Sequence, residues 1–183
     1  MNYRCFIALE APDEVRRDLE ARLFAFRRQP GVNWVKEANL HLTLLFLGDV
    51  DSARIPELEQ VLAKELRGLA AWPLRMRGLE LFPARQPRLV WASLESQDRA
   101  VFDLHKSLLG AVRQSGIEPD PKPLKLHITL GRIKAQIPAT LEREILQSEV
   151  NREFHAFGQV TLYRSVLKPE GPSYTVLNQY NLQ

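Results

Sequence analysis

Residues 40–44 read Leu40-His-Leu-Thr-Leu44, and the pattern returns at residues 126–130 as Leu126-His-Ile-Thr-Leu130. The 183-residue chain holds only four histidines and five threonines. In a shuffled chain, one histidine would begin His-x-Thr-Leu with a probability of about 0.004, so two among four would occur on the order of once in ten thousand chains. The repeat therefore indicates a duplicated element with a function, because composition alone does not explain it.

The spacing inside each motif is typical of a β-strand. Residues two apart in a strand point to the same face, so His41 shares a face with Thr43, and His127 with Thr129. The apolar residues between them then face the core. If the two strands face each other, two imidazoles and two hydroxyls surround one anion-sized space.

These side chains suit acid–base chemistry on a phosphate. Histidine titrates near neutrality and serves as general base or general acid. At phosphorus, one imidazole can activate the entering oxygen while the other protonates the leaving oxygen. The threonine hydroxyls can donate hydrogen bonds to the non-bridging oxygens, on which charge builds up.

Two other readings of the motif compete with catalysis. A single His-x-Thr in a strand is usually a half-buried histidine that is hydrogen-bonded to a neighbour, but that reading gives no reason for a second copy. Histidine is also a common metal ligand. Neither motif has an Asp, Glu, Cys or third His at ligand spacing, so we expect no metal site.

Composition places the chain among globular proteins. It is 45% hydrophobic and 26% charged, and its net charge of +3 comes mostly from arginine, which permits an anionic partner without requiring one. The lone cysteine, Cys5, excludes an intramolecular disulfide. No apolar run is long enough to span a membrane, and the apolar run near Met1 is too short for a signal peptide. We therefore expect a cytoplasmic protein.

Hydrophobic spacing predicts short strands interspersed with amphipathic helices. The first helix is opened by Pro12 and ends before Gly31, and Gly48-Asp49 is expected to stop the second strand. The predicted strands cover residues 3–9, 41–47, 74–82, 88–94, 126–133, 158–167 and 174–182, with further helices at about 55–69, 99–114 and 138–150 and a final turn at 169–172. Because strands come singly and in pairs, this order favours an α+β domain with mostly antiparallel pairing.

With its two His-x-Thr-Leu motifs, the chain resembles a known family, the two-histidine phosphoesterases, in particular the LigT/ThpR-like RNA 2′,3′-cyclic phosphodiesterases. The likeness runs through nearly the whole chain. The segments that carry it are Arg4-Cys-Phe-Ile-Ala-Leu9, Trp34-Val-Lys36, Asn39-Leu-His-Leu-Thr-Leu-Leu-Phe-Leu-Gly48, Pro87-Arg-Leu-Val-Trp91, Leu126-His-Ile-Thr-Leu-Gly-Arg132, Ser165-Val-Leu167 and Gly171-Pro-Ser-Tyr174.

The resemblance implies a single domain over residues 1–183, built as two lobes related by a pseudo-twofold axis. Each lobe would carry one motif, at 41–44 and 127–130, and two mostly antiparallel sheets with flanking helices would enclose a central cleft. We expect a monomer with no obligate protein partner.

The resemblance also implies hydrolysis of RNA 2′,3′-cyclic phosphate ends to 2′-phosphates without a metal or other cofactor, with 2′–5′ RNA ligation as the reverse activity. On this assignment His41 is the proton donor to the leaving O3′, and His127 is the proton acceptor that activates water. The symmetry of the motifs leaves the opposite division open.

Arg132 occupies the position where the family keeps an arginine. Simple alternation puts it on the face opposite His127, so it can bind the phosphate only if the strand is disrupted. Gly131 is the residue most able to host a bulge that resets the alternation. At the equivalent place the first motif carries Phe46, so the two halves differ there.

Several further residues are candidates for contacts with RNA. Trp34 and Phe46 are candidates for base stacking, although core roles are commoner for such residues. Arg85 and Arg88 are candidates to follow an RNA backbone, and solvated loop arginines are again the commoner case. Tyr163 and Tyr174 are candidates to line the cleft.

Two rival functions stay open. The first is a phosphodiesterase of the same superfamily that acts on small cyclic nucleotides or 2′–5′ oligonucleotides. The second is a non-catalytic module that binds RNA ends, for which the basic charge is the only independent support. Binding alone does not need two titrating groups, which favours an enzyme.

Overall fold

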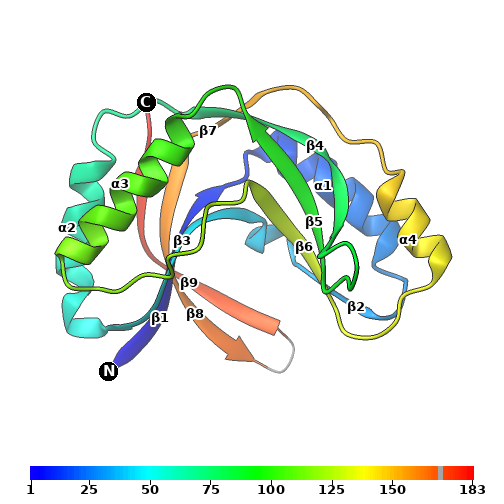
Figure 1. Ribbon diagram of the computed structural model, residues 1–183, viewed down its shortest axis with the longest axis horizontal. Helices are drawn as coiled ribbons and strands as arrows, with labels where there is room; N and C mark the ends of the chain where they lie inside the picture. The colour runs from blue at the N-terminus through cyan, green and yellow to red at the C-terminus, as the bar shows by residue number, and fades with distance from the viewer. Residues whose placement is uncertain (169–170) are drawn as a thin grey trace.

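One curled, antiparallel sheet forms the centre of the computed structural model, which describes residues 1–168 and 171–183 (Figure 1). Within these residues the sheet has nine strands in the order β7-β4-β5-β6-β3-β1-β8-β9, with β2 paired to β6. The strands are β1 (Asn2–Glu10), β2 (Val32–Trp34), β3 (His41–Asp51), β4 (Trp72–Phe82), β5 (Leu89–Ser96), β6 (His127–Ile133), β7 (His155–Phe157), β8 (Gln159–Lys168) and β9 (Gly171–Asn181). The α+β class and the antiparallel pairing are as predicted.

The sheet consists of two halves that meet where β3 lies beside β6. Among the residues that the structure describes, one pair, Leu42 with Ile128, is in register there. The family resemblance implied two sheets, and the structure differs in that this contact joins them into one. Helices α2 (Ile55–Glu65) and α3 (Ala100–Gln114) cover the half with β1 and β3, whereas α1 (Asp13–Phe26) and α4 (Ala139–Leu146) lie with β5 and β6 (Figure 1).

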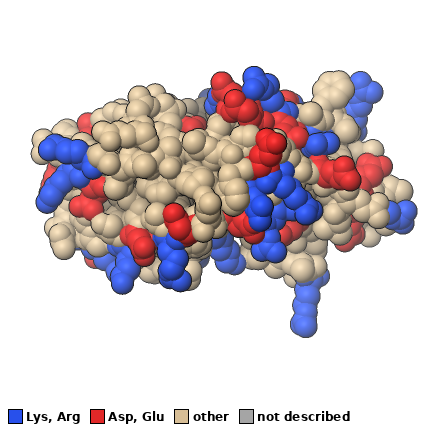
Figure 2. Space-filling model, turned by 90° about the horizontal axis from the view of Figure 1, so that it is seen from above, with Lys and Arg blue, Asp and Glu red and all other residues tan. Residues whose placement is uncertain are grey.

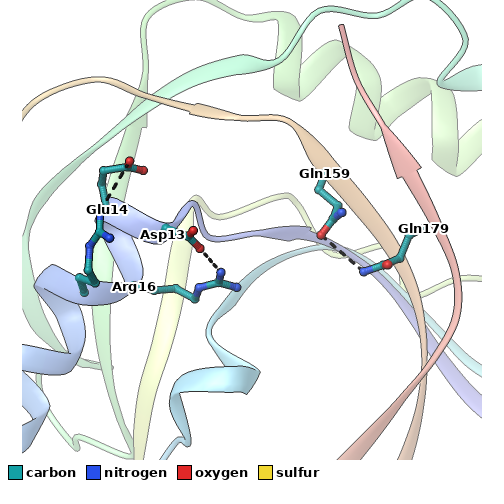
Figure 3. Close-up of polar contacts among 6 residues, drawn as sticks. Asp13, Glu14, Arg16, Gln159 and Gln179 are labelled. Carbon is teal, nitrogen blue, oxygen red and sulfur yellow. Dashed lines mark hydrogen bonds and ion pairs between the residues drawn. The ribbon is translucent and has the colours of Figure 1, made fainter.

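The helices form where apolar residues recur at helical spacing. In α1 the buried residues lie four or three apart, and Pro12 stands at the N-cap, as the sequence predicted. They are Val15, Leu19, Leu23 and Phe26. The exposed side of its first turn carries ion pairs between Asp13 and Arg16 and between Glu14 and Arg17 (Figure 3). No helix in residues 1–168 and 171–183 is long and apolar enough to cross a membrane.

Strands β8 and β9 form a long hairpin beside β1. Gln159 pairs with Asn181 and Thr161 with Gln179, and a diagonal hydrogen bond of 3.4 Å runs from Nε2 of Gln179 to Oε1 of Gln159 (Figure 3). The hairpin also brings Tyr163 and Tyr174 together, with ring centroids 5.8 Å apart. The predicted turn at 169–172 lies partly outside the described residues, because 169 and 170 are not among them.

Some predicted boundaries were wrong. Gly48 does not end its strand: it has a φ of +69° at a β-bulge, and β3 continues to Asp51. The second and fourth helices end earlier than predicted, at Glu65 and Leu146. Strands β2 and β7 were not predicted, because three residues are too few to show an alternating pattern.

Candidate active site

The two motifs carry the same irregularity in their strands. On β3, Thr43 pairs with Ala8 and Leu45 with Ile7, so Leu44 has no partner on β1. On β6, the same holds for Leu130, because the register passes from Thr129 directly to Gly131 on the side of β5. Each motif therefore contains a β-bulge just after its threonine. A bulge of one residue reverses the alternation of side chains beyond it.

The bulges bring Phe46 and Arg132 onto the faces that carry the histidines. Phe46 is half exposed, and its ring lies 6.0 Å from that of Phe6, which is itself 5.1 Å from the ring of His41. Arg132 is exposed, and its positive charge partly offsets the rise that burial causes in the pKa of Tyr174. The Tyr174 ring itself lies 5.5 Å from the ring of His41.

Gly131 makes the second bulge possible by its lack of a side chain. A Cβ at this position would lie 2.5 Å from Cγ1 of Val32 and 2.9 Å from the Trp34 ring, since β2 packs directly over it. The disruption of this strand was predicted at Gly131 itself. The unpaired residue is the neighbouring Leu130, and glycine provides the space that the packing requires.

Both histidines are oriented by the same backbone contact. Nδ1 of His41 lies 2.8 Å from the carbonyl oxygen of Asn39, and Nδ1 of His127 lies 2.8 Å from that of Lys125. A carbonyl oxygen only accepts, so Nδ1 carries the proton and Nε2 is the nitrogen left for chemistry. Nε2 of His41 is 3.1 Å from Oγ1 of Thr43, which places imidazole and hydroxyl side by side, as the motif predicted.

Burial makes both imidazoles weaker bases than free histidine. It lowers the pKa of His41 to about 4, against the hydrogen bond to Asn39, and a positive charge on His127 lowers it further. The pKa of His127 is also lowered, mainly by burial. The charge of one histidine thus affects the other. A phosphate anion between them would favour the protonated forms and raise both values.

Aromatic rings surround His41 on the side of β1 and the β8–β9 hairpin. The Phe6 and Tyr174 rings are 5.1 and 5.5 Å away, and that of Tyr163 is 6.1 Å away. The hydroxyl of Tyr163 donates a hydrogen bond of 2.7 Å to Oε1 of Glu10, which fixes its ring. Tyr163 and Tyr174, both candidates from the sequence, thus lie beside His41, whereas Phe6 was missed.

A different aromatic group lies beside His127. The Trp91 ring is 4.4 Å from the imidazole and stacks on Phe82 at 4.0 Å. Its Nε1 donates a hydrogen bond of 3.0 Å to Oε2 of Glu80. Trp91 was missed as well, because its place opposite Thr129 follows from the pairing of β5 with β6. The motif itself holds no signal for either ring.

Trp34 occupies a different environment. Its ring stacks on Phe26 of α1 at 5.8 Å, and the residue is half-buried against the main core. These contacts agree with the core alternative for Trp34. Within residues 1–168 and 171–183, no three His, Cys, Asp or Glu side chains gather in a group that could hold a metal ion.

Comparison with known proteins identifies the family. The model of the family described as LigT like phosphoesterase matches residues 9–91, which include the first motif. Two relatives are both named RNA 2′,3′-cyclic phosphodiesterase. The one from Thermus thermophilus is 37% identical over 98% of this chain and 90% of its own. The one from Thermotoga maritima is 32% identical over 95% of this chain and 92% of its own. The chain therefore belongs to the LigT-like phosphoesterases. The family model ends before the second motif, but the matches to these relatives extend over nearly the whole chain.

Solved structures agree with this assignment. The crystal structure of TT0787 from Thermus thermophilus matches with a TM-score of 0.79 at 32% identity, over 97% of both chains. The apo form of LigT from E. coli matches with a TM-score of 0.72 over 99% of this chain and 98% of its own. At 23% identity, that second likeness concerns the fold alone.

Proposed function

We propose that this protein hydrolyses 2′,3′-cyclic phosphate ends of RNA to 2′-phosphomonoesters by paired-histidine acid–base catalysis. The observation that carries the proposal is that one chain holds two histidines in the same way, each on a strand with a bulge just after the threonine of its motif. Nδ1 of each is held by a backbone carbonyl, each shares a strand face with the threonine of its motif, and Nε2 of His41 lies 3.1 Å from Oγ1 of Thr43. The names of the full-length relatives support the cyclic RNA end as substrate.

In the proposed reaction, Nε2 of His127 accepts a proton from water, and the water oxygen attacks phosphorus. The bond from phosphorus to O3′ breaks while Nε2 of protonated His41 donates its proton to that oxygen, so the phosphate stays on O2′. When the 5′-hydroxyl of a second RNA takes the place of water, the same steps join the two chains by a 2′–5′ linkage. This division of roles follows the family resemblance.

Three donors are proposed to stabilise the charge that the phosphoryl oxygens gain in the transition state. The hydroxyls of Thr43 and Thr129 stand on the histidine faces of their strands, and Arg132 contributes a planar guanidinium. None of the ion pairs among residues 1–168 and 171–183 includes Arg132, so its charge is available to an anion. Phe46, half exposed on the same side, is proposed to stack on a base.

We propose that residues 1–183 form one domain of two lobes, with one motif per lobe. Both histidines come from the same chain, which supports a monomer without an obligate partner. We further propose that it works in the cytoplasm, since its lone cysteine is buried and an oxidising compartment would give it no disulfide. The proposed chemistry uses no metal.

Phosphorus NMR of a cyclic-ended oligoribonucleotide, incubated with the protein in excess EDTA, tests the reaction. We expect the cyclic signal to be replaced by that of a 2′-phosphate. A 3′-phosphate would reverse which ribose oxygen leaves and would contradict the roles given to His41 and His127. If the signal stays unchanged while a small cyclic nucleotide or a 2′–5′ oligonucleotide is cleaved, the protein is a phosphodiesterase with that other substrate. Stable binding without turnover would replace catalysis by end recognition.

A further inference from the structure

The sheet face that carries His127 continues across β5 and β4 to the edge of the sheet. On β5, Trp91, Ser93 and Glu95 point to one face because residues two apart do so. Ser93 pairs with His127 on one side and with Gly78 of β4 on the other. The far side of this face is therefore two strand spacings from His127, roughly 10 Å.

Three arginines gather at the far side of this face. Arg75, Arg77 and Arg152 line a pocket of about 360 Å³ together with Met76 and Glu95. Glu95 forms ion pairs with Arg75 and, at 3.7 Å, with Arg77. One carboxylate thus serves two guanidinium groups, and Arg152 enters no ion pair among the described residues, so the pocket carries an excess of positive charge.

Strands β5 and β4 connect this pocket to the histidine. The Trp91 ring touches the imidazole of His127 and donates its hydrogen bond to Glu80. Glu80 pairs with Trp91 and follows Arg77 by three residues on β4. Burial raises the pKa of Glu80, but hydrogen bonds, that from Trp91 among them, and the charge of Arg77 outweigh it and lower the pKa overall. An extended ligand that starts at His127 therefore meets the arginines next.

An aromatic ring lies beside the pocket, against Arg75. Phe154 is 41% exposed, and the guanidinium carbon of Arg75 lies 4.8 Å from its ring centroid. Guanidinium groups bind phosphates, and exposed aromatic rings stack on bases. Proteins that bind single-stranded nucleic acid commonly combine these two features. The face seen in Figure 2 shows basic side chains in separate groups with acidic ones among them, and no single broad basic surface.

We propose that this pocket, the upstream pocket of Arg75, Arg77, Arg152 and Phe154, binds the phosphates and a base of the nucleotides that precede the cyclic end of an RNA. This inference rests on the proposed function and specifies its substrate as an oligonucleotide. The upstream pocket contributes to oligonucleotide binding and makes no contact with a mononucleotide.

The test compares a cyclic mononucleotide with a cyclic-ended tetranucleotide across salt concentrations. The double variant Arg77→Ala/Arg152→Ala keeps the Arg75–Glu95 ion pair. Each lost phosphate contact reduces the slope of log affinity against log salt by about 0.7 for single strands, so the double variant should lose about 1.4 from the slope of kcat/KM with the tetranucleotide. Its kcat/KM with the mononucleotide should stay within about twofold.

Three further variants sharpen the comparison. Arg67→Ala removes an equally exposed arginine after α2 and should change neither slope. Arg85→Ala tests the rival path along the β4–β5 loop. Glu95→Gln removes the carboxylate that neutralises the arginines and should steepen the slope with the tetranucleotide. Equal slopes for the wild type and the double variant, or a loss confined to Arg85→Ala, would overturn the proposal.

Binding provides a readout that does not need turnover. Fluorescence anisotropy with a tetranucleotide that ends in a 2′-phosphate gives Kd as a function of salt for the same variants. If the wild type cleaves no cyclic end, the proposed function fails, yet a slope reduced by about 1.4 in the double variant still supports the upstream pocket. An unchanged slope contradicts the pocket whether or not the protein is an enzyme.

Discussion

Leu42 and Ile128 are the one register pair that joins the two halves of the sheet, and each stands between the histidine and the threonine of its motif. Both side chains are fully buried. Because the strands are antiparallel, His41 lies next to the position of Thr129, and Thr43 next to that of His127. We therefore expect this hydrophobic pair to set the separation of the two motif histidines.

Shortening the Leu42 side chain should affect both stability and catalysis. We expect Leu42→Ala to lower the free energy of unfolding by about 2–5 kcal/mol, the usual loss for a buried leucine. It should also lower kcat at temperatures where the variant is fully folded, because the motifs can then shift. Denaturant unfolding and steady-state kinetics measure the two effects.

Leu62→Ala is the matched control, since Leu62 is equally buried but lies on α2, away from the motifs. It should lose similar stability with little change in kcat. Equal losses of kcat in both variants would mean that the Leu42–Ile128 contact has no special part in placing the histidines.

The pH dependence of kcat/KM should be bell-shaped with an acidic optimum. Activity needs one protonated and one neutral imidazole, and the two apparent pKa values belong to the pair. Burial lowers the pKa of both groups, that of His41 to about 4. As pH rises through the upper value the acid is lost, and as it falls through the lower value the base is lost. The optimum should therefore lie between about pH 4 and 6.5.

The profile of kcat should lie at higher pH than that of kcat/KM, because bound phosphate raises the pKa values in the complex. Both profiles can be measured with one cyclic substrate, with circular dichroism at each pH to verify folding. An optimum of kcat/KM above pH 7, or a monotonic profile, would not fit this pair of histidines.

Gly131 should tolerate no side chain. The added Cβ of Gly131→Ala would meet Val32 and Trp34, so β2 or β6 must shift, and we expect a loss of about 1–3 kcal/mol in unfolding free energy. The shift should also move Arg132 and lower kcat. Gly78→Ala is the control, since a Cβ there meets nothing within 4 Å. Comparable effects in both variants would remove the special role of Gly131.

Much of the site could be predicted from spacing alone. Strand alternation placed His41 beside Thr43, and helical spacing located α3 within one residue of its observed limits. The rest depends on contacts between strands. Gly48 resembles a turn in the sequence but lies in a bulge because β1 runs alongside it.

The same reason explains the residues that were missed. Phe6 and Trp91 approach the histidines only through the registers of β1 with β3 and β5 with β6. The bulge after Thr43, which puts Phe46 on the face of His41, is likewise a property of two paired strands. The residue pattern within one strand does not show which other strands will pair with it.

The division of roles between the histidines is tested most directly by a cyclic substrate in which sulfur replaces O3′. A thiolate leaves without help from an acid, because its pKa is far below that of an alcohol. With the oxygen substrate, His41→Ala and His127→Ala should each lose about 10²–10⁴-fold in kcat. With the sulfur substrate, His41→Ala should regain most of its loss and His127→Ala should not. Recovery of His127→Ala instead, or of neither variant, would contradict the account.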